Sequence, residues 1–124
     1  RIIQSILDIA AYKNRVGVFN EDAIDFMEKE VESSSYEPIF VYIDPPYYKA
    51  GPSLYRHFYT KEDHRQLAKY IKDKRFPWLL SYDDTQEIRD LYNKEHCVNL
   101  QLNYSVNSHR KEKELLIYNM GLLV

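Results

Sequence analysis

The segment "IFVYI" (39–43), which runs directly into "DPPYY" (44–48), limits the possible folds of this chain more than any other. Its unbroken apolar and aromatic run predicts a strand that is buried on both faces, as in a parallel sheet. Two prolines end this strand, because proline donates no backbone hydrogen bond. A buried strand that ends in an acid, a rigid corner and two aromatic rings places chemical groups at one defined edge of a sheet.

Helices and strands alternate along the rest of the chain. Their apolar positions predict helices over 1–14, 21–32, 60–74 and 83–95. Strands are predicted over 15–20, 39–43, 76–82, 97–105 and 114–120. The segment 47–59 has no clear period and is predicted to be a ring-rich loop. Thr60 and Asp63 are spaced as a capping box for the third helix. The alternation indicates an α/β fold whose sheet is parallel at first. The short polar link at 106–113 predicts that the last two strands form an antiparallel hairpin at one edge.

The composition narrows the class of protein. With 124 residues, the chain is long enough for one domain with a modest core. Its formal net charge of -2 gives no overall basic field for nucleic acid, although a local patch would suffice. No apolar run could span a bilayer, and the single cysteine excludes an intrachain disulfide, as expected of a cytoplasmic protein. The histidines lack metal-ligand spacing, so we expect no metal site, and His64 is interpreted as a helix-surface residue.

The corner after the buried strand offers a defined set of chemical groups. Ligands of open α/β sheets lie beyond the carboxyl ends of the strands, and Asp44 stands at such an end. Pro45 and Pro46 stiffen the corner and fix the direction of its carbonyls, while Tyr47 supplies a flat ring. Acceptors beside a ring suit a planar group that carries an NH2, such as a nucleobase. On spacing alone, a simple turn after a strand explains the same residues equally well.

Several segments, in the same order along the chain, resemble the C-terminal part of Dam-like DNA adenine-N6 methyltransferases. Besides the Asp-Pro-Pro-Tyr corner, they are "VFNEDAIDFM" (18–27), "LYRHFYTKEDHRQL" (54–67), "WLLSYDDT" (78–85) and "YSVNSHRKEKELLIYN" (104–119). The resemblance implies the C-terminal half of a Rossmann-like class I methyltransferase sheet. It also implies that S-adenosylmethionine donates a methyl group to the N6 amine of an adenine flipped out of double-stranded DNA.

The resemblance assigns roles to individual residues. Asp44 and the carbonyl of Pro45 would accept hydrogen bonds from the amine, and Tyr47 would stack on the base, with Pro46 completing the catalytic corner. Asp22, together with Asp44, would lie beside the methyl donor. The base pocket would be walled by Tyr48, Tyr55 and Phe58, and DNA phosphates would be contacted by Lys49, Arg56 and Arg110. Each set has a plain alternative: a helix cap for Asp22, loop packing for the rings, and solvated surface charge for the basic residues.

Three features of the family are not matched. The family holds the methionine part of its cofactor in a glycine-rich turn, whereas Gly17, Gly51 and Gly121 are isolated. An acidic residue for the ribose and a target-recognition region are also unmatched. We therefore expect residues 1–124 to be a single partial catalytic domain, inactive alone, that binds S-adenosylmethionine weakly or not at all. The strand over 39–43 would then have an unpaired edge, covered by a homodimer, a segment swap or the strand over 15–20.

Other functions remain compatible with these residues. One is a different amine methyltransferase, acting on RNA guanine-N2, cytosine or protein glutamine, although the aspartate that opens the corner favours adenine or RNA guanine. Another is a truncated, non-catalytic interaction module. Restriction–modification, phage and housekeeping roles all fit the sequence equally.

Overall fold

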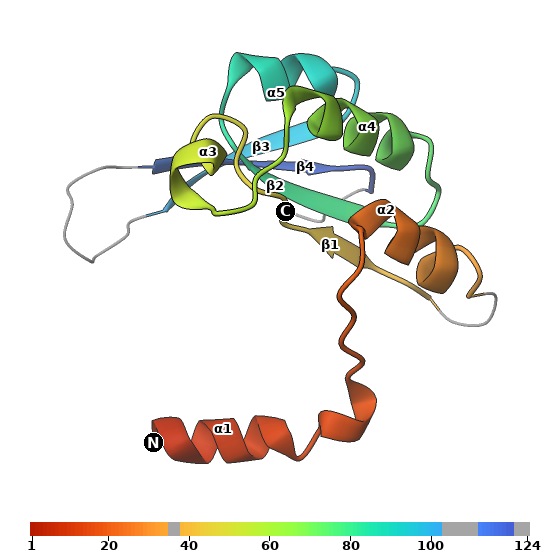
Figure 1. Ribbon diagram of the computed structural model, residues 1–124, viewed down its shortest axis with the longest axis vertical. Helices are drawn as coiled ribbons and strands as arrows, with labels where there is room; N and C mark the ends of the chain where they lie inside the picture. Colours follow the sequence, from red (N-terminus) through yellow and green to blue (C-terminus); the bar gives the residue numbers. More distant parts are fainter. Residues whose placement is uncertain (35–37, 103–111, 121–124) are drawn as a thin grey trace. The chain divides into compact units, whose positions relative to one another are not determined.

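The computed structural model describes residues 1–34, 38–102 and 112–120 (Figure 1). The chain forms two compact units, Arg1–Ser35 and Tyr36–Val124. None of the described helices is both long enough and apolar enough to cross a membrane.

The first unit is helical. It contains α1 (Ile2–Ala10), the 3₁₀ turn η1 (Lys13–Arg15), α2 (Ala23–Phe26) and the π-helical turn η2 (Met27–Val31). The helices predicted over 1–14 and 21–32 are therefore present, in shorter or interrupted form. The strand predicted over 15–20 is wrong: this segment pairs with no described strand. Its start is taken by η1, and extended backbone becomes a strand only where a neighbour supplies hydrogen bonds.

The second unit is an α/β fold. Its elements are β1 (Val41–Ile43), α3 (Gly51–Leu54), α4 (Lys61–Lys72), β2 (Trp78–Asp83), α5 (Gln86–Leu91), β3 (His96–Leu102) and β4 (Glu112–Tyr118). The described strands form a four-stranded sheet in the order β1-β2-β4-β3. β1 and β2 are parallel, and β4 is antiparallel to both β2 and β3. The predicted α/β class, with a parallel start and an antiparallel hairpin at one edge, is confirmed.

Two predicted connections differ from the described structure or lie mostly outside it. The loop predicted over 47–59 is partly wrong, because α3 forms within it, with a proline in its first turn where the missing N–H costs nothing. Most of the polar link predicted over 106–113 lies outside the described residues.

The core lies on one face of the sheet. Alternate residues of β2 and β4 are fully buried there, and the register sets Leu80 opposite Ile117 and Tyr82 opposite Leu115. Figure 1 shows α4 and α5 on the same side of this sheet, and they contribute the buried side chains Leu67, Ile71 and Ile88. On the other face, Tyr42 stays 55% exposed.

Local hydrogen bonds fix where the elements begin. The capping box at the start of α4 is confirmed: Asp63 N donates to Thr60 Oγ1 (3.2 Å) and Thr60 N donates to Asp63 Oδ2 (2.7 Å). The hydrogen bonds that Thr60 donates to Asp63 Oδ2, from its amide and from its hydroxyl (2.8 Å), hold the pKa of the Asp63 carboxyl below its usual value. At the start of β2, Trp78 N donates to Asn119 Oδ1 (2.9 Å), and Asn119 Nδ2 donates to the carbonyl of Phe76 (2.9 Å). Asn119, the residue after β4, therefore satisfies backbone groups at the beginning of β2.

Candidate active site

The Asp-Pro-Pro-Tyr corner lies at the carboxyl end of β1. Asp44 is exposed, Pro45 is buried and Tyr47 is half-buried. Because β1 and β2 are parallel and Ile43 is in register with Leu80, the residues that end β2 lie beside the corner. The corner is thus placed by the sheet and held by its neighbours.

Ser81 holds the Asp44 carboxylate. The Ser81 hydroxyl donates to Asp44 Oδ1 over 3.0 Å, and Ser81 Oγ lies 2.9 Å from the Tyr42 hydroxyl. Ser81 itself is 1% exposed. Three side chains from two paired strands therefore form one hydrogen-bonded row that ends at the exposed acid.

Asp83 holds the backbone just after the corner. Its Oδ1 accepts from the amide of Tyr48 (2.7 Å) and its Oδ2 accepts from the amide of Lys49 (2.8 Å). Charge-assisted bonds from two consecutive backbone amides are stronger than neutral ones. The chain then turns into α3, whose first residue donates its amide to the carbonyl of Tyr47 (Gly51 N to O, 2.8 Å). Both oxygens of one carboxylate thus fix the direction in which the corner leaves the sheet.

The ring of Tyr47 is tethered at its far end. Its hydroxyl donates to Glu114 Oε1 of β4 over 3.2 Å. A ring held by the backbone at one end and by a hydrogen bond at the other keeps the direction of its long axis, which suits a stacking platform.

His64 lies behind the corner and corrects the sequence-based interpretation. It is fully buried rather than on the helix surface, because α4 turns it to the same face as Leu67, Ala68 and Ile71. Its Nδ1 lies 2.9 Å from the Tyr82 hydroxyl, and its ring centroid lies 5.1 Å from that of Tyr48. Burial lowers the pKa of His64 and raises that of Tyr82. Among the described residues, none hydrogen-bonds to His64 Nε2.

The predicted base-pocket residues are not equivalent. Tyr48 is half-buried against His64, whereas Tyr55 and Phe58 are 45% and 48% exposed. Phe58 nevertheless lies near the corner, since a Cβ added at Gly51 would be 3.6 Å from Pro46 Cβ and 3.8 Å from Phe58 Cβ. The side chains of Lys49 and Arg56 are exposed. Arg110 lies outside the described residues.

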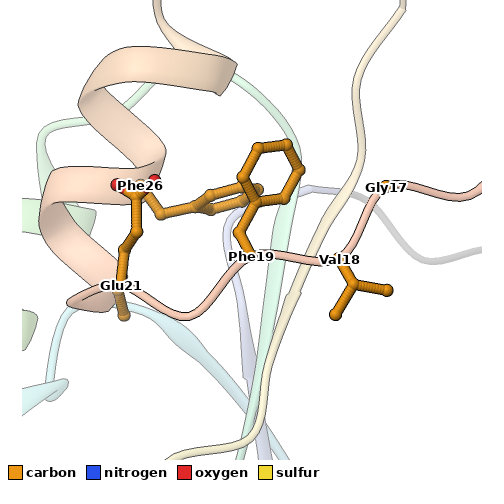
Figure 2. A pocket seen from close by; sticks show the side chains of 6 residues that line it. Gly17, Val18, Phe19, Glu21 and Phe26 are labelled. Carbon is orange, nitrogen blue, oxygen red and sulfur yellow. The ribbon is translucent and has the colours of Figure 1, made fainter.

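Asp22 caps α2 in the first unit. Its Oδ1 accepts from the amides of Ile24 (2.9 Å) and Asp25 (3.2 Å), so the predicted structural role is present. Next to it, an open depression of about 400 Å³ is lined by Gly17, Val18, Phe19, Glu21, Ala23 and Phe26. The rings of Phe19 and Phe26 lie 5.0 Å apart, and Figure 2 shows both rings beside this depression. Two rings with the Glu21 carboxylate close by fit a flat, polar-edged group such as a nucleoside.

Four residues of the site were missed from the sequence: Ser81, Asp83, Glu114 and His64. Ser81 and Asp83 could have been found, because both stand at the end of an apolar run parallel to the first, and such ends meet at one edge of a sheet. Across the described residues, histidine, cysteine and carboxylate side chains form no cluster of three that could hold a metal ion.

Comparison with known proteins identifies the family of the chain. No curated protein matches the chain significantly. The family model of D12 class N6 adenine-specific DNA methyltransferases matches residues 4–106, which include the whole corner and the β2 residues Ser81 and Asp83 that hold it, but not Glu114 of β4. The chain therefore belongs to the D12 class N6 adenine-specific DNA methyltransferase family.

Proposed function

We propose that this chain carries the catalytic corner of an enzyme that methylates the N6 amine of adenine in double-stranded DNA. The observation that supports this most is the hydrogen bonding of the two carboxylate oxygens of Asp44. One of its oxygens accepts from Ser81, and no described residue hydrogen-bonds to the other. An exposed carboxylate with one oxygen fixed and one available is suited to accept a hydrogen bond from an amine.

The corner would act on a base that has left the helix, because the N6 amine cannot be reached within the stack. Tyr47 would stack on the flipped adenine, and the amine would donate to Asp44 and to the carbonyl of Pro45. These acceptors orient the nitrogen lone pair toward the donor methyl, while the rigid Pro45–Pro46 backbone keeps them in place. Methyl transfer would form an N–C bond in place of the donor's C–S bond, whose electron pair would stay on the sulfur. The proton that the amine loses would pass by way of the exposed Asp44 carboxylate to water.

S-adenosylmethionine, when bound, would supply the methyl group on a positively charged sulfur. The depression next to Asp22 supports a place for its nucleoside, since Phe19 and Phe26 offer apolar rings and Glu21 lines it with a carboxylate. Asp22, whose Oδ1 caps α2, is proposed to accept a hydrogen bond from the same group.

Three basic and two aromatic residues are proposed to contact DNA. Lys49, Arg56 and Arg110 are proposed to contact phosphates, and Tyr55 and Phe58 to wall the base pocket. Tyr48 would support that pocket from behind, through its contact with His64. A DNA substrate also supports a cytoplasmic location. Finally, we propose that a second copy of the chain covers the outer edge of β1.

The test uses the natural gene product that contains residues 1–124. It is incubated with S-adenosylmethionine and either duplex DNA or ribosomal RNA, and the digested products are analysed for methylated bases by mass spectrometry. We expect N6-methyladenine in DNA. Asp44→Ala should lower the rate on the order of 100-fold or more, as for removal of an essential transition-state contact. Asp73→Ala, at the exposed end of α4, is the matched control and should leave the rate unchanged.

Two results would refute this function. Methylation of RNA guanine in place of DNA adenine would assign the corner to another amine. Undiminished methylation of DNA by Asp44→Ala would remove the corner from the chemistry altogether.

A further inference from the structure

We propose that Ser81 is a positioning residue for the reaction, and that Tyr42 supports it from the outer face of the sheet. This inference rests on the proposed function, because its effect is exerted on the carboxylate that receives the amine. The row Tyr42–Ser81–Asp44 would select which Asp44 oxygen faces the substrate.

The position of Ser81 is set by the strand pairing. Tyr42 is in register with Leu79, and Ser81 follows two residues later on β2, where side chains return to the same face. Asp44 likewise follows two residues after Tyr42. Strand geometry therefore brings all three side chains to one face, and the measured separations of 2.9 and 3.0 Å are those of good O–H···O hydrogen bonds.

The direction of the two hydrogen bonds follows from the groups involved. An ionised carboxylate can only accept, so the single hydroxyl proton of Ser81 goes to Asp44 Oδ1. Ser81 Oγ is then left as an acceptor, and the Tyr42 hydroxyl is the donor to it. Each hydroxyl of the row therefore has one defined acceptor. Rotation of the Asp44 carboxylate would break its hydrogen bond with Ser81, and no other described residue offers a replacement donor.

Burial explains why this row can hold a geometry. Asp44 is exposed, and a solvated carboxylate on its own would sample several rotamers. Ser81 is 1% exposed and fixed within the ladder between β1 and β4, so its hydroxyl has little freedom. A rigid donor beneath a mobile acceptor orders the acceptor, and misplacement of a reacting group by about 1 Å can cost on the order of 100-fold in rate.

The test measures kcat and KM for methylation of duplex DNA by the natural gene product. Ser81→Ala should lower kcat by about 10- to 100-fold while KM for DNA and for S-adenosylmethionine changes by less than about threefold. Ser81→Thr keeps the hydroxyl and should recover most of kcat. Tyr42→Phe should lower kcat less than Ser81→Ala does. Tyr12→Phe, at a tyrosine that is 56% exposed, is the matched control and should have no effect.

A double variant separates positioning from general packing. If Ser81 acts through Asp44, then Ser81→Ala should add no further loss to the residual activity of Asp44→Ala, which removes the acceptor of the Ser81 hydroxyl. Independent, multiplying losses would overturn the inference, as would an unchanged kcat in Ser81→Ala. If Ser81→Ala does not fold, Tyr42→Phe decides, since its ring remains and an unchanged kcat would contradict the row. Absence of DNA methylation by the unmodified protein would overturn the proposed function, and this inference with it.

Discussion

At the scale of single residues, His64 gives the clearest pH-dependent prediction. Burial lowers its pKa in the folded chain, while Asp83 and Asp63 oppose this to a smaller extent. The unfolded chain, with a histidine pKa of about 6.5, then binds the proton more readily. The free energy of unfolding should therefore be constant above about pH 7 and fall as the pH drops below about 6.5, by at most about 1.4 kcal/mol per pH unit.

Urea unfolding between pH 7.5 and 5 checks this. His64→Gln should remove most of the slope in this range, whereas His96→Gln, at an exposed residue of β3, should keep it. An identical slope in His64→Gln would contradict the assignment to His64. The carboxyl groups of Asp63 and Asp84, whose pKa values are lowered, contribute only at lower pH.

The same residue shows where sequence reasoning ends. Asp44 to Tyr47 could be predicted as a strand-end corner because prolines, acid and rings are contiguous there. His64 could not, because its burial depends on which face of α4 meets the sheet. Charged residues flank it, Asp63 before and Arg65 after, and only contact with Tyr82 and Tyr48 reveals its role.

At the scale of elements, the start of β2 depends on one side chain from the end of β4. Asn119 accepts from the amide of Trp78 and donates to the carbonyls of Phe76 and Lys74, at 2.9, 2.9 and 3.3 Å. Asn119→Ala would leave these backbone groups without their partner near a fully buried tryptophan. We expect a loss of about 2–3 kcal/mol in the free energy of unfolding.

Chemical denaturation of both variants checks this, with Asn93→Ala as the control. Asn93 is exposed after α5, and its replacement should cost less than about 0.5 kcal/mol. Equal stability of the two variants would show that water replaces the Asn119 side chain without cost.

Element types could mostly be predicted, since the helices α4 and α5 and the strands β1 to β4 follow from periodicity and capping. The strand over 15–20 could not be judged from its residues, because its apolar pattern says nothing about whether a partner strand is present. The helix α3 was missed because four residues are too few for a helical period.

At the scale of the whole molecule, the outer edge of β1 predicts association. Among the described strands only β2 pairs with β1, while Phe40 and Tyr42 are 56% and 55% exposed. An apolar edge with unpaired backbone groups favours pairing with another chain. Sedimentation equilibrium of the chain should therefore show a dimer at micromolar concentrations.

Phe40→Lys should weaken this dimer, because a charge beside the edge disfavours pairing. Leu54→Lys places the same charge at a 62% exposed residue of α3 and should not. A monomer throughout the concentration range would exclude association through β1.

The pairing of β1 with β2 has a consequence for how correctly folded protein can be recognised in a sample. A slip of one residue in this pairing would turn every side chain of β1 to the opposite face, so Asp44 would lose Ser81 and the backbone after it would lose Asp83. The helices and the buried ladder between β2 and β4 would survive such a slip, and circular dichroism would barely register it. The rate of catalysis would then be a more sensitive measure of the correct pairing of β1 with β2. It would detect molecules with a slipped β1 that ordinary folding assays count as native.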